Sequence, residues 1–167
     1  MGKIGVGKST ALALEAKKYM KKGIKVYSNF HLLGAYKFDP MHLGQYNFEN
    51  CAIFIDEAQI VFNNREYRST PKHIFEFIAL SRHYNCDIHF ASQSWEDLDV
   101  KIRRQAHRIY IVQPTILFFT IKLQLVRLNF GLNEDSTEIV TKYRMSLLDT
   151  RYKLKRPAWK YFDSFER

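Results

Sequence analysis

The feature that most constrains the fold of this chain is the run Gly2-Lys-Ile-Gly-Val-Gly-Lys-Ser9 at its beginning. It matches the pattern G-x-x-x-x-G-K-[ST], in which glycines let backbone N–H groups turn inward onto phosphate oxygens at a helix N-terminus. Residues 8–22 are rich in Ala, Leu, Glu and Lys, which favours a helix, and Gly23 stands where helices commonly end. An ordinary Gly-rich loop is the alternative, but eight matched positions leading into a helix favour a phosphate-binding loop.

The residue types in this loop indicate its ligand. Lys8 would reach the β- and γ-phosphates of ATP, and the Ser9 hydroxyl would be a ligand of the accompanying Mg²⁺. The expected nucleotide-binding residues are the glycines, the lysine and two hydroxyl residues, namely Gly2, Gly5, Gly7, Lys8, Ser9 and Thr10. We therefore expect ATP and Mg²⁺ to be the cofactors.

A phosphate-binding loop normally follows a buried strand that fixes its N-terminal side. In this sequence only Met1 precedes the loop. We therefore expect the first strand of the core to be missing from this sequence, or to be supplied by another segment.

A second feature is the acidic pair Asp56 and Glu57, which directly follows the apolar run Cys51–Ile55. Such a run is typical of a strand buried on both faces of a parallel sheet. A carboxylate at the end of this strand can hold Mg²⁺, so we assign this role to Asp56 and the role of general base on the attacking water to Glu57. Alternatively, both carboxylates only cap a helix. The upstream phosphate-binding loop favours the catalytic interpretation.

Four further positions are candidates for contacts with the phosphates. Gln93 follows the apolar run 86–91, and ligands bind beyond the carboxyl ends of such strands, so its amide would bridge the γ-phosphate and the water. Arg82, or the pair Arg103 and Arg104, could reach the phosphates of a neighbouring subunit, because an arginine can act in trans. A polar strand end and solvated surface charge are the respective alternatives. The predicted catalytic residues are Glu57, Gln93 and Arg82.

The rest of the sequence alternates between strand and helix patterns. Apolar runs at 51–55, 86–91 and 109–112 predict strands, and Pro71 is placed to begin a helix. The expected apolar stripe of this helix consists of Ile74, Phe75, Ile78 and Ala79. Parallel strands need crossover helices, so we predict an α/β fold with a mostly parallel sheet flanked by helices. Alternating residues at 120–125 predict a small antiparallel addition. We expect a core at 1–113 and a β-rich C-terminal extension of the same domain at 114–167.

Charge and cysteine usage bound the partners and the compartment. The 26 Lys and Arg residues outnumber the 17 Asp and Glu residues, and the net charge of +9 favours nucleic acid or an acidic membrane face as a partner. A generally basic soluble protein is the alternative. Both cysteines open apolar runs, which suits a reducing compartment. No signal peptide is visible, and Gln113, Pro114 and Lys122 interrupt the longest apolar stretch, so we expect a soluble, cytoplasmic protein.

Taken together, these motifs resemble a known family. The similarity is carried by the loop at 2–9, by Cys51-Ala-Ile-Phe-Ile-Asp-Glu-Ala-Gln59, by Ser81-Arg-His83 before the strand ending near Gln93, and by Leu148-Asp-Thr150 with an aromatic two residues on. These residues look like the zonular occludens toxin domain, a family that includes morphogenesis ATPases of filamentous phages and is related to the FtsK and HerA translocases. The resemblance spans nearly the whole chain, and the two nucleotide motifs are its most specific part.

The resemblance implies a P-loop NTPase core of the ASCE type with strand order 5-1-4-3-2. It also implies an ATPase at the cytoplasmic face of the inner membrane that forms a homo-oligomeric ring and drives DNA export, packaging or virion assembly together with phage or membrane partners. Because no base-recognition motif is readable, we expect DNA binding to be independent of sequence. Two other hypotheses stay open: a non-catalytic nucleotide-binding or scaffold protein at the inner membrane, and an assembly factor whose basic face meets acidic lipid.

Overall fold

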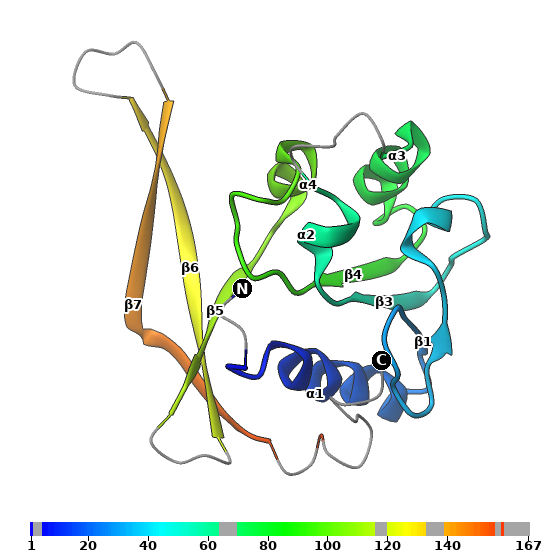
Figure 1. The fold of residues 1–167 in the computed structure, drawn as a ribbon, viewed down its shortest axis with the longest axis horizontal. Helices are drawn as coiled ribbons and strands as arrows, with labels where there is room; N and C mark the ends of the chain where they lie inside the picture. The colour runs from blue at the N-terminus through cyan, green and yellow to red at the C-terminus, as the bar shows by residue number, and fades with distance from the viewer. Residues whose placement is uncertain (2–4, 64–69, 116–119, 133–138, 156–157, 159–167) are drawn as a thin grey trace.

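The computed structural model describes residues 1, 5–63, 70–115, 120–132, 139–155 and 158 (Figure 1), and in the two long C-terminal strands it describes the side chains of 121–126 and 150–154. The strands form two sheets, one with the order β2-β1-β3-β4 and one with the order β5-β6-β7. The first sheet is parallel throughout and the second is antiparallel. The predicted α/β class with a small antiparallel addition is therefore confirmed.

The parallel sheet contains β1 (Lys25–Ser28), β2 (Tyr36–Lys37), β3 (Cys51–Ile55) and β4 (Cys86–Phe90). β3 lies between β1 and β4, and its pairing with β4 runs from Cys51 opposite Cys86 to Ile55 opposite Phe90. The predicted adjacency of these two apolar runs is confirmed. The neighbours β4, β3 and β1 correspond to strands 4, 3 and 2 of the order that the family resemblance implies.

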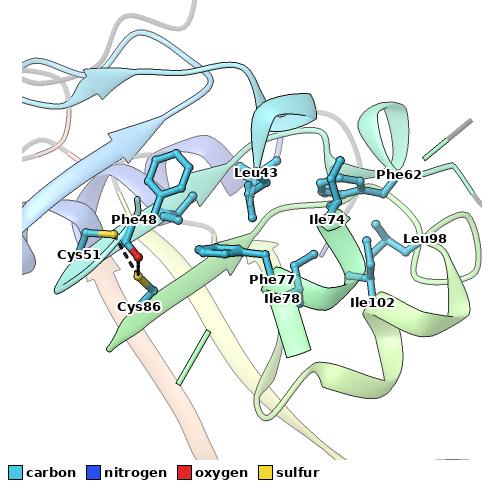
Figure 2. Packing of buried hydrophobic residues seen from close by; sticks show 13 residues of the cluster. Leu43, Phe48, Cys51, Phe62, Ile74, Phe77, Ile78, Cys86, Leu98 and Ile102 are labelled. Carbon is cyan, nitrogen blue, oxygen red and sulfur yellow. Dashed lines mark hydrogen bonds between the residues drawn. The ribbon is translucent and has the colours of Figure 1, made fainter. Parts of the chain in front are cut away.

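Both faces of β3 are buried, which explains why its sequence is apolar without alternation. Ile53 and Ile55 pack into one hydrophobic cluster with Phe62 and Ile74, whereas Ala52 and Phe54 pack on the other face with residues of the first helix. Figure 2 shows the first cluster, in which side chains from the strands and from several helices meet. Successive side chains of a strand point to opposite faces, so a central strand with helices on both sides needs apolar residues at every position.

The helices cover the two faces of this sheet unequally. α1 (Lys8–Lys21) lies on one face, and α2 (Ala58–Val61), α3 (Lys72–Leu80) and α4 (Val100–Gln105) lie on the other (Figure 1). A short 3-10 helix, η1 (Pro40–His42), falls in the connection between β2 and β3. α1 ends just before Gly23, whose φ of 74° is the left-handed conformation expected after a helix. None of the described helices combines the length and the apolar character needed to cross a bilayer.

The predicted apolar stripe of α3 needs a correction. The helix begins at Lys72, directly after Pro71 as expected, but its buried residues are Ile74, Phe77 and Ile78. Steps of three and four residues from Ile74 lead to Phe77 and Ile78 on one helix face, so Phe75 lies at the edge of this face and Ala79 lies outside it. Ala79 is exposed, whereas the half-buried ring of Phe75 packs against the core cluster and also has the ammonium of Lys101 above it, 4.8 Å from the ring centroid. Ala79 was therefore wrongly placed in the stripe, Phe77 was missed, and Phe75 lies at the edge of the stripe.

The antiparallel sheet contains β5 (Ile109–Pro114), β6 (Thr120–Leu132) and β7 (Ile139–Leu154). The run 109–112 was expected in the parallel core, but β5 pairs antiparallel with β6. A short connection after Pro114 requires this, because only antiparallel strands can be joined without a long crossover. β5 also forms two backbone hydrogen bonds with Met1. The Met1 amine donates to the Tyr110 carbonyl at 2.7 Å, and the Val112 N–H donates to the Met1 carbonyl at 2.8 Å.

Side chains anchor the antiparallel sheet to α1. Lys153, at the end of β7, donates a hydrogen bond to the Glu15 carboxylate at 2.9 Å, and Lys18 donates to the same carboxylate. Burial raises the pKa of Glu15, but the hydrogen bonds and charges of the two ammonium groups outweigh it and bring the pKa from 4.5 to about 2. Ala158 is buried in the apolar cluster beside α1. Lys153 and Ala158 therefore pack beside the helix that follows the predicted phosphate-binding loop.

We predict that Glu15→Gln lowers the thermal midpoint at pH 7. The pKa of Glu15 is lower in the folded state, so its ionised form stabilises the fold above pH 4.5, and this stability disappears as the pH falls from 4.5 toward 2. Melting curves of the two proteins should therefore converge as the pH is lowered. Lys18→Ala, which removes only the exposed i,i+3 pair, should cost little, about 0.2–0.5 kcal/mol. A difference in thermal midpoint between wild type and Glu15→Gln that stays constant down to pH 3 would contradict this role for Glu15.

Candidate nucleotide-binding site

The described part of the predicted phosphate-binding loop adopts a conformation that favours glycine at two positions. Gly5 has a φ of 76° and Gly7 a φ of 97°, both in the left-handed region that side chains disfavour. A Cβ atom on Gly7 would also lie only 2.8 Å from Ile121 Cγ2 on β6. Gly7 precedes the first residue of α1, and its carbonyl accepts the first helical hydrogen bond from the Ala11 N–H. Residues 5–7 of the predicted loop therefore lead directly into the first helix, as expected, whereas residues 2–4, with Gly2, lie outside the described residues.

Lys8, Ser9 and Thr10 form the beginning of α1, as the motif predicts. Lys8 is buried, with 6% of its side chain exposed. A buried ammonium group is rare without a counter-charge. Its charge acts on the nearby Asp56 carboxylate. Thr10 is half-buried in the first turn of the helix.

The structure brings the two sequence motifs into direct contact. The Ser9 hydroxyl donates a short hydrogen bond to Asp56 Oδ2, across 47 residues of sequence. The other carboxylate oxygen, Oδ1, accepts from the Glu57 N–H at 2.9 Å. Asn29, which follows β1, binds the Asp56 backbone at both ends: it accepts from the N–H at 2.8 Å and donates to the carbonyl at 3.0 Å.

The environment of Asp56 suits a cation. Burial raises the pKa of its carboxyl group; hydrogen bonds from Ser9 and the Glu57 N–H and the charge of Lys8 oppose this rise, while the charge of Glu57 adds to it. A hydroxyl and a carboxylate that converge supply the hard oxygen ligands that Mg²⁺ prefers, with phosphate and water oxygens completing its octahedron. The donor set of Ser9 and Asp56 therefore fits Mg²⁺. Among the described residues no three His, Cys, Asp or Glu side chains cluster as a metal site of their own.

Glu57 lies beside Asp56 in an unusual conformation. Its φ of 50° places a non-glycine residue in the left-handed region, just before α2. Its Oε2 accepts from Gln93 Nε2 at 3.0 Å, so the predicted strand-end glutamine reaches the predicted base. Gln59 Nε2 donates to the same oxygen at 2.5 Å. Strained backbone of this kind costs about 1–3 kcal/mol and clusters at functional sites.

The arginines do not join this group within one chain. Arg82 is exposed and precedes β4, whereas Gln93 follows the opposite end of that strand. Arg103 and Arg104 lie in the last turn of α4 on the far side of the sheet from α1. An action of any of these on a neighbouring subunit stays a prediction.

Two residues of the site were not singled out from the sequence. Asn29 follows β1 at the same sheet edge as Asp56, and the tendency of polar site residues to follow parallel strands could have identified it. Gln59 could not have been found in this way, because it lies in α2, two residues after the base. Only the tertiary contact with Gln93 reveals it, since the Gln93 N–H donates to Gln59 Oε1 at 3.1 Å.

Solved structures with similar folds include two kinds of protein. The N-terminal domain of zonular occludens toxin from Neisseria meningitidis superposes with a TM-score of 0.62 at 14% identity, over 98% of this chain and 96% of that one. The genome packaging NTPase B204 from Sulfolobus turreted icosahedral virus 2, in complex with ATP-gammaS, gives 0.54 at 14% identity over 87% and 95%. Its complex with AMPPCP gives 0.55 at 13% identity. At these identities the likeness shows a shared fold.

Comparison with curated protein sequences finds no match. At the level of families the result is different, because residues 25–164, most of the chain, match the zonular occludens toxin (Zot) family. This agrees with the resemblance seen in the motifs and with the fold of the Neisseria domain. The chain therefore belongs to the Zot family.

Proposed function

We propose that this chain binds ATP with Mg²⁺ and hydrolyses it. The observation that carries the proposal is the contact between the Ser9 hydroxyl and the Asp56 carboxylate, which joins the phosphate-binding loop to the acidic strand end. An ordinary Gly-rich loop, or an acidic pair that only caps a helix, would not require a contact between the two motifs. The packaging NTPase B204, which shares the fold, is solved with ATP-gammaS and with AMPPCP, and this supports a nucleotide as the ligand here.

The residues of the site divide the work of phosphoryl transfer. The loop N–H groups and Lys8 would hold the phosphates, and Ser9 and Asp56 would hold Mg²⁺. Bound Mg²⁺ neutralises charge on the phosphate oxygens. Glu57 would accept a proton from the attacking water, and Gln93 would orient the γ-phosphate and that water. An arginine such as Arg82 would arrive from a neighbouring subunit of a ring.

We further propose that hydrolysis is coupled to moving DNA during export, packaging or virion assembly at the cytoplasmic face of the inner membrane. Membership of the Zot family, the likeness to a genome packaging NTPase and the net charge of +9 support this. A nucleotide-binding scaffold at the membrane is the competing proposal. ATP binding without turnover, in the presence and absence of DNA, would favour the scaffold.

Lys8→Ala and Glu57→Gln should have separable effects. Removing the Lys8 ammonium deletes a phosphate contact of the ground state, so affinity for a non-hydrolysable ATP analogue should fall about 10–100-fold. Glu57→Gln should leave this affinity within about twofold and lower kcat by about 10²–10⁴-fold, since it removes only the base. Lys72→Ala, at a lysine whose side chain is 90% exposed, is the charge-matched control. Equal loss of affinity in the Lys8 and Glu57 variants would refute the role of Glu57.

Asp56→Asn should make the nucleotide-free protein more stable while abolishing the effect of Mg²⁺ on nucleotide affinity. The pKa of Asp56 is raised in the fold, so its ionised form is disfavoured there, and wild-type stability falls as the pH rises through this pKa. Asn cannot ionise, so the variant does not lose stability in this way. Its melting temperature should exceed that of wild type by less as the pH is lowered. Asp97→Asn, at an exposed carboxylate, is the control. An Asp56→Asn protein that melts at a lower temperature than wild type at pH 7 would contradict the raised pKa of Asp56.

Binding to DNA should depend steeply on salt and little on sequence. Contacts to phosphates release counterions, so log K should fall against log salt with a slope of roughly −0.9 per phosphate neutralised on duplex or −0.7 on single strands. Unrelated sequences should give the same affinity within about threefold, since one mismatch at a specific site already costs ~1–3 kcal/mol. Fluorescence anisotropy of labelled DNA, with acidic lipid vesicles as competitor, measures both the salt dependence and the sequence dependence of DNA binding. Tight vesicle binding with no DNA binding at low salt in any nucleotide state would remove DNA as the partner.

A further inference from the structure

We propose that Gln59 is a positioning residue that holds the carboxylate of Glu57 in place for catalysis. The proposal rests on the hydrolytic role proposed above for Glu57. A closed ring of three hydrogen bonds carries it. Gln59 Nε2 donates to Glu57 Oε2 at 2.5 Å, Gln93 Nε2 donates to the same oxygen at 3.0 Å, and the Gln93 N–H donates to Gln59 Oε1 at 3.1 Å.

The backbone around Gln59 fixes this ring. The Ala58 N–H donates to the Ala91 carbonyl at 2.8 Å, and the Ala91 N–H donates to the Ile55 carbonyl at 2.8 Å. Both alanines are buried, with 0% and 5% of their surface exposed. These bonds continue the β3–β4 ladder past the ends of the strands, so the first turn of α2 lies against the segment that follows β4. Gln59 and Gln93 therefore face each other because of main-chain geometry, not by a chance surface contact.

The ring leaves Glu57 with two unequal oxygens. Both amide donors bind Oε2, and no described residue donates a hydrogen bond to Oε1. A carboxylate with one fixed oxygen presents the other in a defined direction, and holding a reacting group in place in advance is how positioning lowers a barrier. Oε1 is therefore the oxygen that would accept the proton of the attacking water.

The two glutamines have different tasks in this arrangement. Gln93 is the residue proposed to orient the γ-phosphate. Its Nε2 carries two hydrogens, so the side chain can keep its bond to Glu57 or turn fully toward the phosphate. When Gln93 turns toward the phosphate, Gln59 is the described donor that stays on Glu57. The backbone bond from Gln93 to Gln59 Oε1 can persist during this rotation, because it does not involve the Gln93 side chain. In this arrangement Gln59 holds the Glu57 carboxylate while the Gln93 side chain binds the γ-phosphate.

The test is Gln59→Met, which keeps the length of the side chain and removes its amide. We expect kcat for ATP to fall about tenfold or more, the effect of losing a hydrogen bond to a charged group. Affinity for a non-hydrolysable ATP analogue should change little, since no phosphate contact is assigned to Gln59. Gln45→Met, the same substitution at an exposed residue that contacts His73, is the matched control and should leave kcat unchanged.

A double variant separates positioning from a general structural defect. If Gln59 acts through Glu57, adding Gln59→Met to Glu57→Gln should lower the residual kcat no further than Glu57→Gln alone. Gln59→Glu is a second single variant in case the methionine perturbs α2. It keeps the size and the acceptor for the Gln93 N–H but places a carboxylate against Glu57, so kcat should again fall while nucleotide affinity is kept.

Several results would overturn the proposal. Wild-type kcat in both Gln59 variants would show that the amide is not needed. An additive loss in the double variant, or a parallel loss of nucleotide affinity, would show that Gln59 acts on the fold or on binding. These outcomes leave the ATPase role intact. By contrast, a wild-type protein without turnover, or Glu57→Gln with full turnover, would remove the proposed function and the role of Gln59 with it.

Discussion

The parallel pairing of β3 with β4 is the constraint on which the candidate site depends. The two strands are paired from Cys51 and Cys86 to Ile55 and Phe90, and parallel strands end at the same edge of a sheet. This edge therefore receives the acidic pair from one strand and Gln93 from the other. A slip by one residue would exchange the two buried faces of β3, so packing on both faces fixes the register.

At the opposite end of these strands, the sulfur atoms of Cys51 and Cys86 lie 3.3 Å apart (Figure 2). Burial raises the pKa of the Cys51 thiol, so it packs as a small apolar group.

The site itself carries local costs that the rest of the fold has to offset. The Asp56 carboxylate is partly removed from water, and Glu57 adopts a left-handed backbone conformation. Asn29 supports this segment by bonding both the N–H and the carbonyl of Asp56. Burying charge and straining the backbone weaken the folded state, yet they accompany the placement of two carboxylates next to the predicted phosphate-binding loop. Conflicts between local preference and overall fold of this kind are expected at functional sites.

The antiparallel sheet is joined to the loop, so it contributes to the shape of the site. Ile121 on β6 occupies the space where a side chain at position 7 would stand, and Val6 and Ala11 pack against Val112, Ile121 and Leu123. The pair of Glu15 and Lys153 adds a polar contact two turns further along α1. Because β6 packs on the loop and on its helix, a change in the position of β6 would act directly on the residues predicted to bind phosphate.

The sequence by itself determined the loop, the first helix, the apolar strands and the acidic pair. Each of these is a local pattern: glycines at fixed spacing, a helix composition ended by Gly23, and apolar runs without alternation. The apolar stripe of α3 was only partly predicted, because Phe75 and Phe77 are equally apolar and only the direction of the sheet selects Phe77. The pairing of 109–114 with β6 was missed for a similar reason, since an apolar run does not specify its partner. The assignment of Ser9 and Asp56 to one Mg²⁺ already implied that these two residues lie close together, but only the tertiary structure decided that Asn29 and Gln59 join the site. Contacts between residues far apart in sequence depend on how the strands are ordered, and no local pattern encodes that order.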